Sequence, residues 1–178
     1  MVTIREATPD DAVAFAAIVR ACWRLVFRGI IPDSVLDRPE DEDIAERAAR
    51  IRGRMVDGWR SYAAEHAGRI VGVARLAMVP VHGYDAEIDG LHVDPAAHRQ
   101  GIGRALVRHA CDHFAAHHER TLYIHVLRGN TGARAFYEAI GGTIVVEDTW
   151  SYAGVPHPAI GYAWADVAQL AGRLRTAP

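Results

Sequence analysis

Lysine is absent from this sequence of 178 residues, and all twenty basic side chains are arginine. A Walker-type phosphate loop is therefore excluded, because that loop uses a lysine to reach the terminal phosphates of a nucleotide. The 20 basic and 22 acidic side chains leave a net charge of −2 at pH 7. A broad nucleic-acid-binding surface is not expected at this charge.

Cysteine is scarce, and long apolar runs are missing. Cys22 and Cys111 lie far apart, each in a helical pattern with apolar neighbours, which favours buried free thiols over a disulfide. The N-terminus is polar and charged, and no apolar run approaches the roughly 18 residues that a membrane-spanning helix requires. With 50% hydrophobic residues, the composition predicts one cytoplasmic globular domain over residues 1–178, with no membrane contact.

Strand-like and helical patterns are interleaved along the chain. We expect strands at 2–6, 61–65, 70–78, 86–93, 121–127, about 143–152 and 159–164. We expect helices at about 9–27, 101–117 and 131–139, and one that starts in the acidic cluster after Pro39. Helices between largely antiparallel strands predict an α/β or α+β fold, in which helices cover the faces of a sheet.

Two close glycines, Gly101 and Gly103, open the helix expected at about 101–117. A helix N-terminus attracts anions through its N–H groups and its dipole, and glycines let a phosphate approach closely. A dinucleotide-binding turn would have a third small residue where Leu106 stands, and a tighter connection to the preceding strand. The glycines alone also fit a simple loop-to-helix start.

Two motifs about 30 residues apart give this turn a more specific interpretation. The segment Gly101-Ile102-Gly103-Arg104-Ala105-Leu106 follows Val93-Asp94-Pro95, and residues 130–141 read NTGARAFYEAIG. In this order they resemble the GNAT superfamily of acyl-CoA-dependent N-acyltransferases, over roughly residues 60–164. The resemblance implies a mixed, largely antiparallel central sheet of about seven strands with helices on both faces. The activity that it implies is transfer of an acetyl group from acetyl-CoA to an amine of a small molecule or peptide, with no metal.

Acetyl-CoA is the cosubstrate that the resemblance implies. In the family, the glycine-rich helix start binds the pyrophosphate, and the preceding strand offers backbone groups to the pantetheine arm. Carried over by position, the coenzyme-binding residues are Leu91, His92, Val93, Arg99, Gln100, Gly101, Ile102, Gly103, Arg104, Asn130, Ala133, Phe136 and Tyr137. His98 departs from the pattern, because the family usually places Arg or Gln three residues before the first glycine.

The resemblance also assigns catalytic roles to Glu87 and Tyr137. Acyl transfer needs a neutral amine and a protonated or stabilised leaving thiolate. Glu87, on the strand that leads to the glycines, is the expected base, and Tyr137 is the expected acid for the thiolate. Asp89 shares the strand face of Glu87 by the two-residue period, so Asp89, His92 or water are alternative bases. Gly90, between them, indicates a bulge or a close approach to the backbone.

Three classes of function remain open at this point. The first is the acetyltransferase, the second is a catalytically inactive acyl-CoA-binding regulatory or sensor module, and the third is an unrelated nucleotide-dependent enzyme. Glu87 together with Tyr137 favours the first, because a protein that only binds needs neither. His109, His113 and His117 recur every four residues, and we interpret them as packing or surface side chains rather than metal ligands.

The amine acceptor is not identified by the sequence. We expect it to be recognised by aromatic and arginine side chains of the early helices and the late strands, namely Trp23, Phe27, Arg28, Trp59, Trp150, Tyr152 and Tyr162. The chain is also a candidate for a homodimer, because the apolar segment 159–164 would suit a sheet edge at which two copies could associate.

Overall fold

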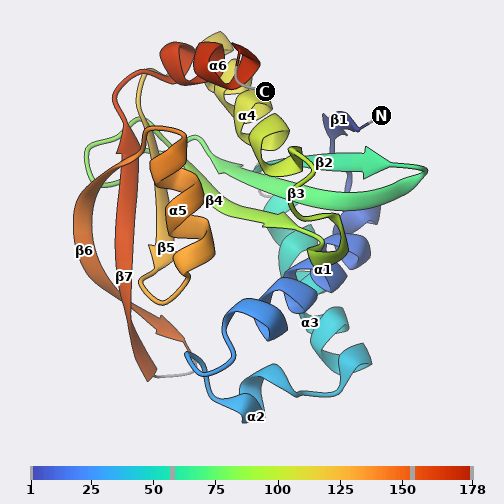
Figure 1. The fold of residues 1–178 in the computed structure, drawn as a ribbon. Coiled ribbons are helices and arrows are strands. Elements are labelled where there is room, and N and C mark those ends of the chain that lie inside the picture. The colour runs from blue at the N-terminus through green and yellow to red at the C-terminus, as the bar shows by residue number, and fades with distance from the viewer. Residues whose placement is uncertain (1, 57–58, 153–154, 177–178) are drawn as a thin grey trace. The chain divides into compact units, whose positions relative to one another are not determined.

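The computed structural model describes residues 2–56, 59–152 and 155–176 (Figure 1). By their internal contacts the residues form two compact units. Unit 1 comprises Met1–Leu76 and Gly90–Leu106, and unit 2 comprises Ala77–Asp89 and Val107–Pro178. The chain therefore enters each unit twice.

Unit 1 holds the N-terminal helices and an antiparallel set of strands. The strands are β1 (Thr3–Glu6), β2 (Arg60–His66) and β3 (Arg69–Ala77). A 3-10 turn, η1 (Pro9–Asp11), leads into α1 (Ala12–Val26), and α2 (Asp33–Leu36) precedes α3 (Glu40–Val56). The Asp11 carboxylate accepts the Thr8 backbone N–H at 2.8 Å, which is half of a capping box that starts the first helix.

The core of unit 1 explains why these segments fold together. Phe15 and Ala16 of α1 and Ile51 of α3 are buried against Ala63 and Val73, which face each other across β2 and β3. Figure 1 shows α1 and α3 running close to each other. On the opposite sheet face, Gly72 lies against Ile102 and Leu106 of α4 (Ile102–Ala116). Helices therefore cover both faces of these strands.

Unit 2 contains the later strands and helices. The beginning of β4 (Ala86–Val93) pairs in parallel with β5 (Leu122–Leu127). Next come β7 (Val155–Trp164), antiparallel to β5, and β6 (Thr143–Tyr152), antiparallel to β7. The helices α5 (Thr131–Ala139) and α6 (Val167–Thr176) belong to this unit.

The strand order is β1-β2-β3-β4-β5-β7-β6, a seven-stranded sheet that is mostly antiparallel. The expected fold class is confirmed. The bounds of β4 and α5 coincide with the expected ranges 86–93 and 131–139.

Two expectations for the late strands were wrong. The strand β7 begins at Val155 rather than at residue 159, because Pro156 and Pro158 pair with β6 beyond the end of the β5 ladder, where proline is tolerated. The segment 159–164 is also not a sheet edge, since β7 is hydrogen-bonded to β5 on one side and to β6 on the other. The helix α6 was not expected at all.

Candidate active site

A short loop links β4 to the helix that the two glycines open. The Asp94 backbone N–H donates to the Val71 carbonyl at 2.8 Å, and the Asp94 side chain accepts from the Ala96 N–H at 2.9 Å. This carboxylate thereby caps η2 (Pro95–Ala97). The loop is held at its base by β3 and by its own cap, so the position of the α4 N-terminus is fixed from the strand side.

The loop then turns through two left-handed residues. Arg99 has a φ of 64° and Gly101 a φ of 76°, whereas Ile102 begins α4 as a buried residue. Successive backbone N–H groups in a turn conformation can form a concave site that suits an anion. Arg99, Gln100 and Gly101 are exposed, and the first N–H groups of α4 have no intrahelical acceptor. The structure thus brings together Arg99, Gln100, Gly101, Ile102, Gly103 and Arg104 at one helix start.

The end of β4 is anchored through the Val93 carbonyl. This oxygen accepts from the Cys22 thiol at 3.1 Å and from His98 Nε2 at 2.8 Å. His98, which departs from the family pattern, therefore fixes the loop to the strand that precedes it. Leu91, His92 and Val93 are all half-buried at this end of the strand.

His92 lies in a setting that keeps its imidazole neutral. Burial lowers its pKa to about 3, and the charges of Arg75 and Arg47 lower it further in the same direction. A group with so low a pKa is a weak base at neutral pH. Next to it, a Cβ added to Gly90 would lie 2.5 Å from Nη2 of Arg75. The expected close approach at Gly90 is therefore made by the Arg75 side chain.

Helix α5 presents the second motif. The Asn130 side chain accepts from the Ala133 N–H at 3.1 Å, which confirms its role as N-cap. Tyr137 is 5% exposed, and its ring lies against Phe136 at 5.5 Å and Tyr162 at 5.6 Å between centroids. Burial raises the pKa of the Tyr137 phenol well above its usual value, so the hydroxyl keeps its proton at neutral pH.

Glu87 lies on the other face of the unit 2 strands from Tyr137. It is paired in register with Tyr123, whereas Tyr162, which Tyr137 contacts, is paired with Ile124. Side chains of neighbouring positions on a strand point to opposite faces. Glu87 and Asp89 are both half-buried and alternate with the buried Ile88, as the two-residue period predicts.

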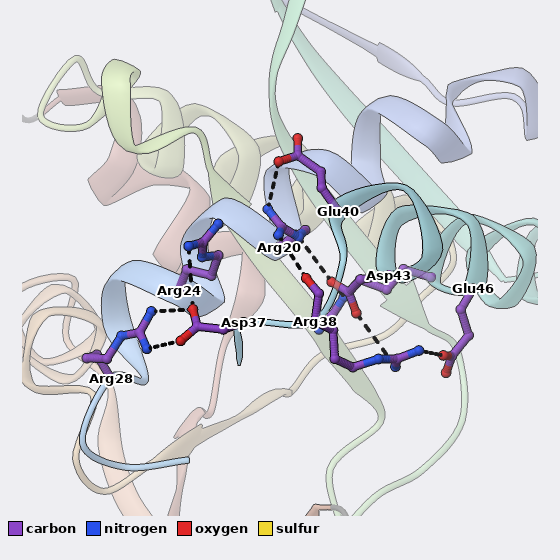
Figure 2. A network of polar contacts seen from close by, with 9 residues as sticks. Arg20, Arg24, Arg28, Asp37, Arg38, Glu40, Asp43 and Glu46 are labelled. Atoms are coloured by element: carbon purple, nitrogen blue, oxygen red, sulfur yellow. Dashed lines mark hydrogen bonds and ion pairs between the residues drawn. The ribbon is translucent and has the colours of Figure 1, made fainter. Parts of the chain in front are cut away.

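The arginine expected to meet the acceptor is engaged elsewhere. Arg28 binds Asp37 through two hydrogen bonds of 2.8 Å, as Figure 2 shows. It also pairs with Asp33 at 2.8 Å. The rings of Trp23 and Phe27 make an edge-to-face contact, with centroids 5.1 Å apart. Trp59 lies under the Arg54 guanidinium at 4.8 Å. The side chain of Tyr152 lies outside the part of the chain whose side chains are described.

A polar row on the Glu87 face was missed by the sequence reasoning. Tyr123 Oη, His125 Nε2 and His157 Nε2 are buried and have no hydrogen-bond partner among the described residues. The available signal was weak: a tyrosine and a histidine two residues apart in an otherwise apolar strand, opposite the lone Gly161. Only the pairing of β5 with β7 shows that they share one face.

Three further expectations concern thiols, metals and membranes. Cys22 and Cys111 are free and buried, and burial raises the pKa of each thiol to about 12. In the described ranges, no group of three or more His, Cys, Asp or Glu side chains is placed to hold a metal ion. Over those ranges no helix has both the length and the apolar character to cross a membrane.

The glycine-opened helix and the Asn-capped helix with a buried tyrosine are the two motifs that point to a coenzyme A-dependent acyltransferase. The acetyltransferase (GNAT) family model matches residues 22–142, and the chain belongs to this family.

Individual proteins agree with this assignment. The "Uncharacterized N-acetyltransferase YuaI" of Bacillus subtilis (strain 168) is 27% identical over 174 residues, which cover 96% of each chain. The PaiA N-acetyltransferase of Thermoplasma acidophilum, solved with coenzyme A, is similar in fold, with a TM-score of 0.71 and 16% identity over 92% of this chain and 99% of that one. The putative acetyltransferase YncA of Salmonella typhimurium, solved with acetyl-CoA, is also similar in fold. Its TM-score is 0.66 and its sequence identity 20%, over 92% of this chain and 93% of that one.

Proposed function

We propose that this chain, as one domain over residues 1–178, transfers the acetyl group of acetyl-CoA to an amine by direct attack. The observation that carries the proposal is the loop at the start of α4, where Arg99 and Gly101 both adopt left-handed backbone conformations at an exposed helix N-terminus. Such a helix start accommodates an anion such as a pyrophosphate without any lysine. Acetyl-CoA supplies an acyl carbon that is activated as a thioester.

The residues proposed to bind the coenzyme have distinct roles. Backbone N–H groups of residues 99–104 bind the pyrophosphate, and the guanidinium groups of Arg99 and Arg104 offset its charge. Leu91, His92 and Val93 offer backbone groups to the pantetheine arm. On α5, Asn130, Ala133 and Phe136 complete the coenzyme-binding set. The family resemblance supports these last assignments.

Glu87 is the proposed general base. An amine of pKa about 10.4 needs about 4.6 kcal/mol to become neutral at pH 7, whereas an α-amine with a pKa near 8 needs about 1.4 kcal/mol. Glu87 accepts the amine proton as the amine nitrogen forms its bond to the acyl carbon. His92 is a poorer candidate because its pKa of about 3 makes its imidazole a weak base. Asp89 and water remain the alternatives to be tested.

Tyr137 is the proposed general acid. When the carbon–sulfur bond breaks, the phenol donates its proton to the departing sulfur. The raised pKa of Tyr137 keeps that proton in place at neutral pH until a thiolate is there to accept it.

A catalytically inactive coenzyme-binding sensor is the alternative, and two measurements separate it from the enzyme. Calorimetric titration with acetyl-CoA is expected to show binding, and no binding at high micromolar concentration would contradict the coenzyme site. An amine-library screen, followed by release of free thiol, is then expected to show turnover. Binding without turnover of any amine would favour the sensor. Because both cysteines are buried, they are expected to give little background in a thiol assay.

The acceptor and the assembly state belong to the same proposal. The acceptor is an amine of a small molecule or peptide. If two copies associate through their late strands, β6 is the strand available in unit 2, because β7 is paired on both sides. Ile144 and Val145 of β6 are 47% and 40% exposed.

A further inference from the structure

One face of the unit 2 strands carries polar side chains across the four strands β4, β5, β7 and β6. Glu87 of β4 is in register with Tyr123 of β5, and His125 follows two residues later on the same face. His125 is opposite Gly161 of β7, and Asp148 of β6 is opposite Ala159, two residues along from that glycine. Residues paired across strands share a face, so these side chains form one row.

Two of these polar side chains are buried without partners. Tyr123 is 2% exposed, and its hydroxyl has no hydrogen-bond partner in the described part of the protein. The same holds for Nε2 of His125. His157, 5% exposed, repeats the pattern farther along the face. A buried polar atom without a partner is destabilising, and proteins keep such atoms where a ligand or a water completes them.

The backbone is shaped to place the Tyr123 ring. A Cβ at Gly161 would collide with the ring and hydroxyl of Tyr123, so glycine is required at this position. The turn between β3 and β4 also contacts this ring. In that turn His82 has a φ of 50° and Gly83 a φ of 83°, and the flanking residues Val81 and Tyr84 form an antiparallel β-bridge. The rings of His82 and Tyr84 lie 5.0 and 6.0 Å from that of Tyr123.

The acidic side chains that act on this row are Glu87 and Asp148. Burial, with smaller contributions from Glu87 and Asp148, raises the pKa of Tyr123 to about 12, so its hydroxyl is a proton donor at neutral pH. Burial lowers the pKa of His125, with Asp148 opposing that effect and His82 adding to it, so its imidazole tends to be neutral. Two acids attract a cation, and the phenol and the His125 imidazole offer hydrogen bonds beside it.

We propose that Tyr123 and His125 recognise the acceptor, and that this acceptor is a cationic amine with a hydroxyl, amide or other hydrogen-bonding group a few bonds from its nitrogen. The ammonium group is drawn to Glu87 and Asp148, while the second group pairs with the Tyr123 hydroxyl and His125 Nε2. Simple alkylamines leave these two atoms unpaired, and amines with a carboxylate place a negative charge beside the two acids. This inference rests on the proposed acetyltransferase function and names its substrate class.

The first test needs no substrate. Tyr123→Phe removes a hydroxyl that has no partner, so the melting temperature of the free protein is expected to stay the same or to rise. Tyr162→Phe is the matched control, because the buried Tyr162 hydroxyl donates to Glu138 at 2.6 Å and its loss is expected to lower the melting temperature. If Tyr123→Phe lowers it as much as Tyr162→Phe does, the hydroxyl has a structural partner such as a buried water, and the proposal fails.

The second test uses three amines of equal chain length with acetyl-CoA. We expect kcat/KM for 3-amino-1,2-propanediol to exceed that for n-propylamine at least tenfold, and that for 3-aminopropanoate to be the lowest. Tyr123→Phe and His125→Leu are each expected to remove most of the preference for the diol, with the KM for acetyl-CoA unchanged. The exposed His66→Gln is the variant expected to leave all three values as they are.

The outcomes separate the two proposals. An equal or greater rate with n-propylamine, or a preference that survives in both variants, overturns the acceptor assignment. So does a protein that turns over none of the three amines. Acetyl-CoA binding, measured by calorimetry, tests the coenzyme site independently of either result.

Discussion

Tyr137 combines burial with a retained proton, and its substitution tests the acid step directly. Tyr137→Phe keeps the ring contacts with Phe136 and Tyr162 and removes only the hydroxyl. A group that acts in the transition state affects kcat rather than coenzyme affinity. We expect kcat to fall about tenfold or more, with the acetyl-CoA dissociation constant little changed. Steady-state kinetics and calorimetry measure the two quantities, and Tyr62→Phe on β2 serves as a matched buried control. An unchanged kcat would remove Tyr137 from the mechanism.

Glu87 is tested through the pH dependence of turnover. At low pH most of the amine is protonated and a base is most needed, whereas near the pKa of the amine the neutral form is already abundant. The rate of Glu87→Gln relative to the parent is therefore expected to be lowest at low pH and to recover as pH rises. Profiles of kcat/KM between pH 6 and about 9.5 show this. Asp89→Asn is the matched comparison on the same strand face, and if its profile changes while that of Glu87→Gln overlays the parent, Asp89 is the base.

At the scale of elements, the packing of α1 on α3 depends on a buried acid. Asp43 lies 3.5 Å from Nε of Arg20 (Figure 2). It also accepts from Arg47 Nε at 2.8 Å, and its side chain is only 5% exposed. Arg20 also donates to Glu40 and to the Arg38 carbonyl, both at 3.2 Å. The Arg47 guanidinium stacks on Trp23 at 4.5 Å. Asp43 is thus a counter-charge shared by the two arginines, and Arg20 has Glu40 as a second one.

Asp43→Asn is expected to destabilise the protein by about 3 kcal/mol, because two buried guanidinium groups lose their shared counter-charge. Urea unfolding with a fluorescence readout measures the free energy of unfolding. Glu46→Gln is the control on the same helix: Glu46 pairs with Arg38 at 2.8 Å but is 52% exposed, so the change is expected to stay within about 0.5 kcal/mol. Equal unfolding midpoints for the two variants would show that the Asp43 network contributes no more than a surface pair.

The elements also show what a sequence can predict. The bounds of β4 and α5 followed from local signals: alternating apolar positions in one, and an Asn cap before an apolar stripe in the other. The beginning of β7 was missed because its prolines argue against a strand, and only pairing with β6 beyond β5 makes them acceptable. The helix α6 had a usable sequence signal: Asp166 precedes Val167, Leu170 and Leu174, which repeat with helical spacing. In the structure the Asp166 side chain accepts from the Gln169 N–H at 2.9 Å.

The candidate site also has a part that local sequence motifs can predict and a part that depends on strand pairing. The loop before α4 is local in the sequence, so its residues could be proposed as coenzyme ligands from adjacent motifs, and that assignment stays a prediction. Tyr123, His125 and Gly161 are brought onto one face only by the ladder between β5 and β7. Burial without a partner is a property of the folded protein, which is why the sequence carried only a weak signal for these residues.

For the whole molecule, His92 makes stability depend on pH. Its folded-state pKa of about 3 lies below the 6.5 of a free imidazole, because burial and the nearby arginines disfavour the charged form. Between these two values the unfolded chain binds a proton that the folded chain does not, so unfolding becomes easier as pH falls. The stabilisation is complete above about pH 6.5 and is lost progressively toward pH 3, at up to about 1.4 kcal/mol per pH unit for one proton. His109 and His125, whose pKa values burial also lowers, add slopes of the same sign.

The His92→Gln variant isolates the contribution of this one imidazole to the pH dependence of the free energy of unfolding. The variant cannot take up a proton at position 92, so its free energy of unfolding is expected to fall less steeply than that of the parent between pH 6.5 and 4. Above pH 7 the two curves should run parallel, whatever constant offset the substitution introduces. Urea titrations at pH 7.5, 6.5, 5.5 and 4.5 give the four points that are needed, with the exposed His66→Gln as control. Parallel curves over the whole range would mean that His92 titrates alike in the folded and unfolded chains, and that its imidazole is then available as a base near neutral pH.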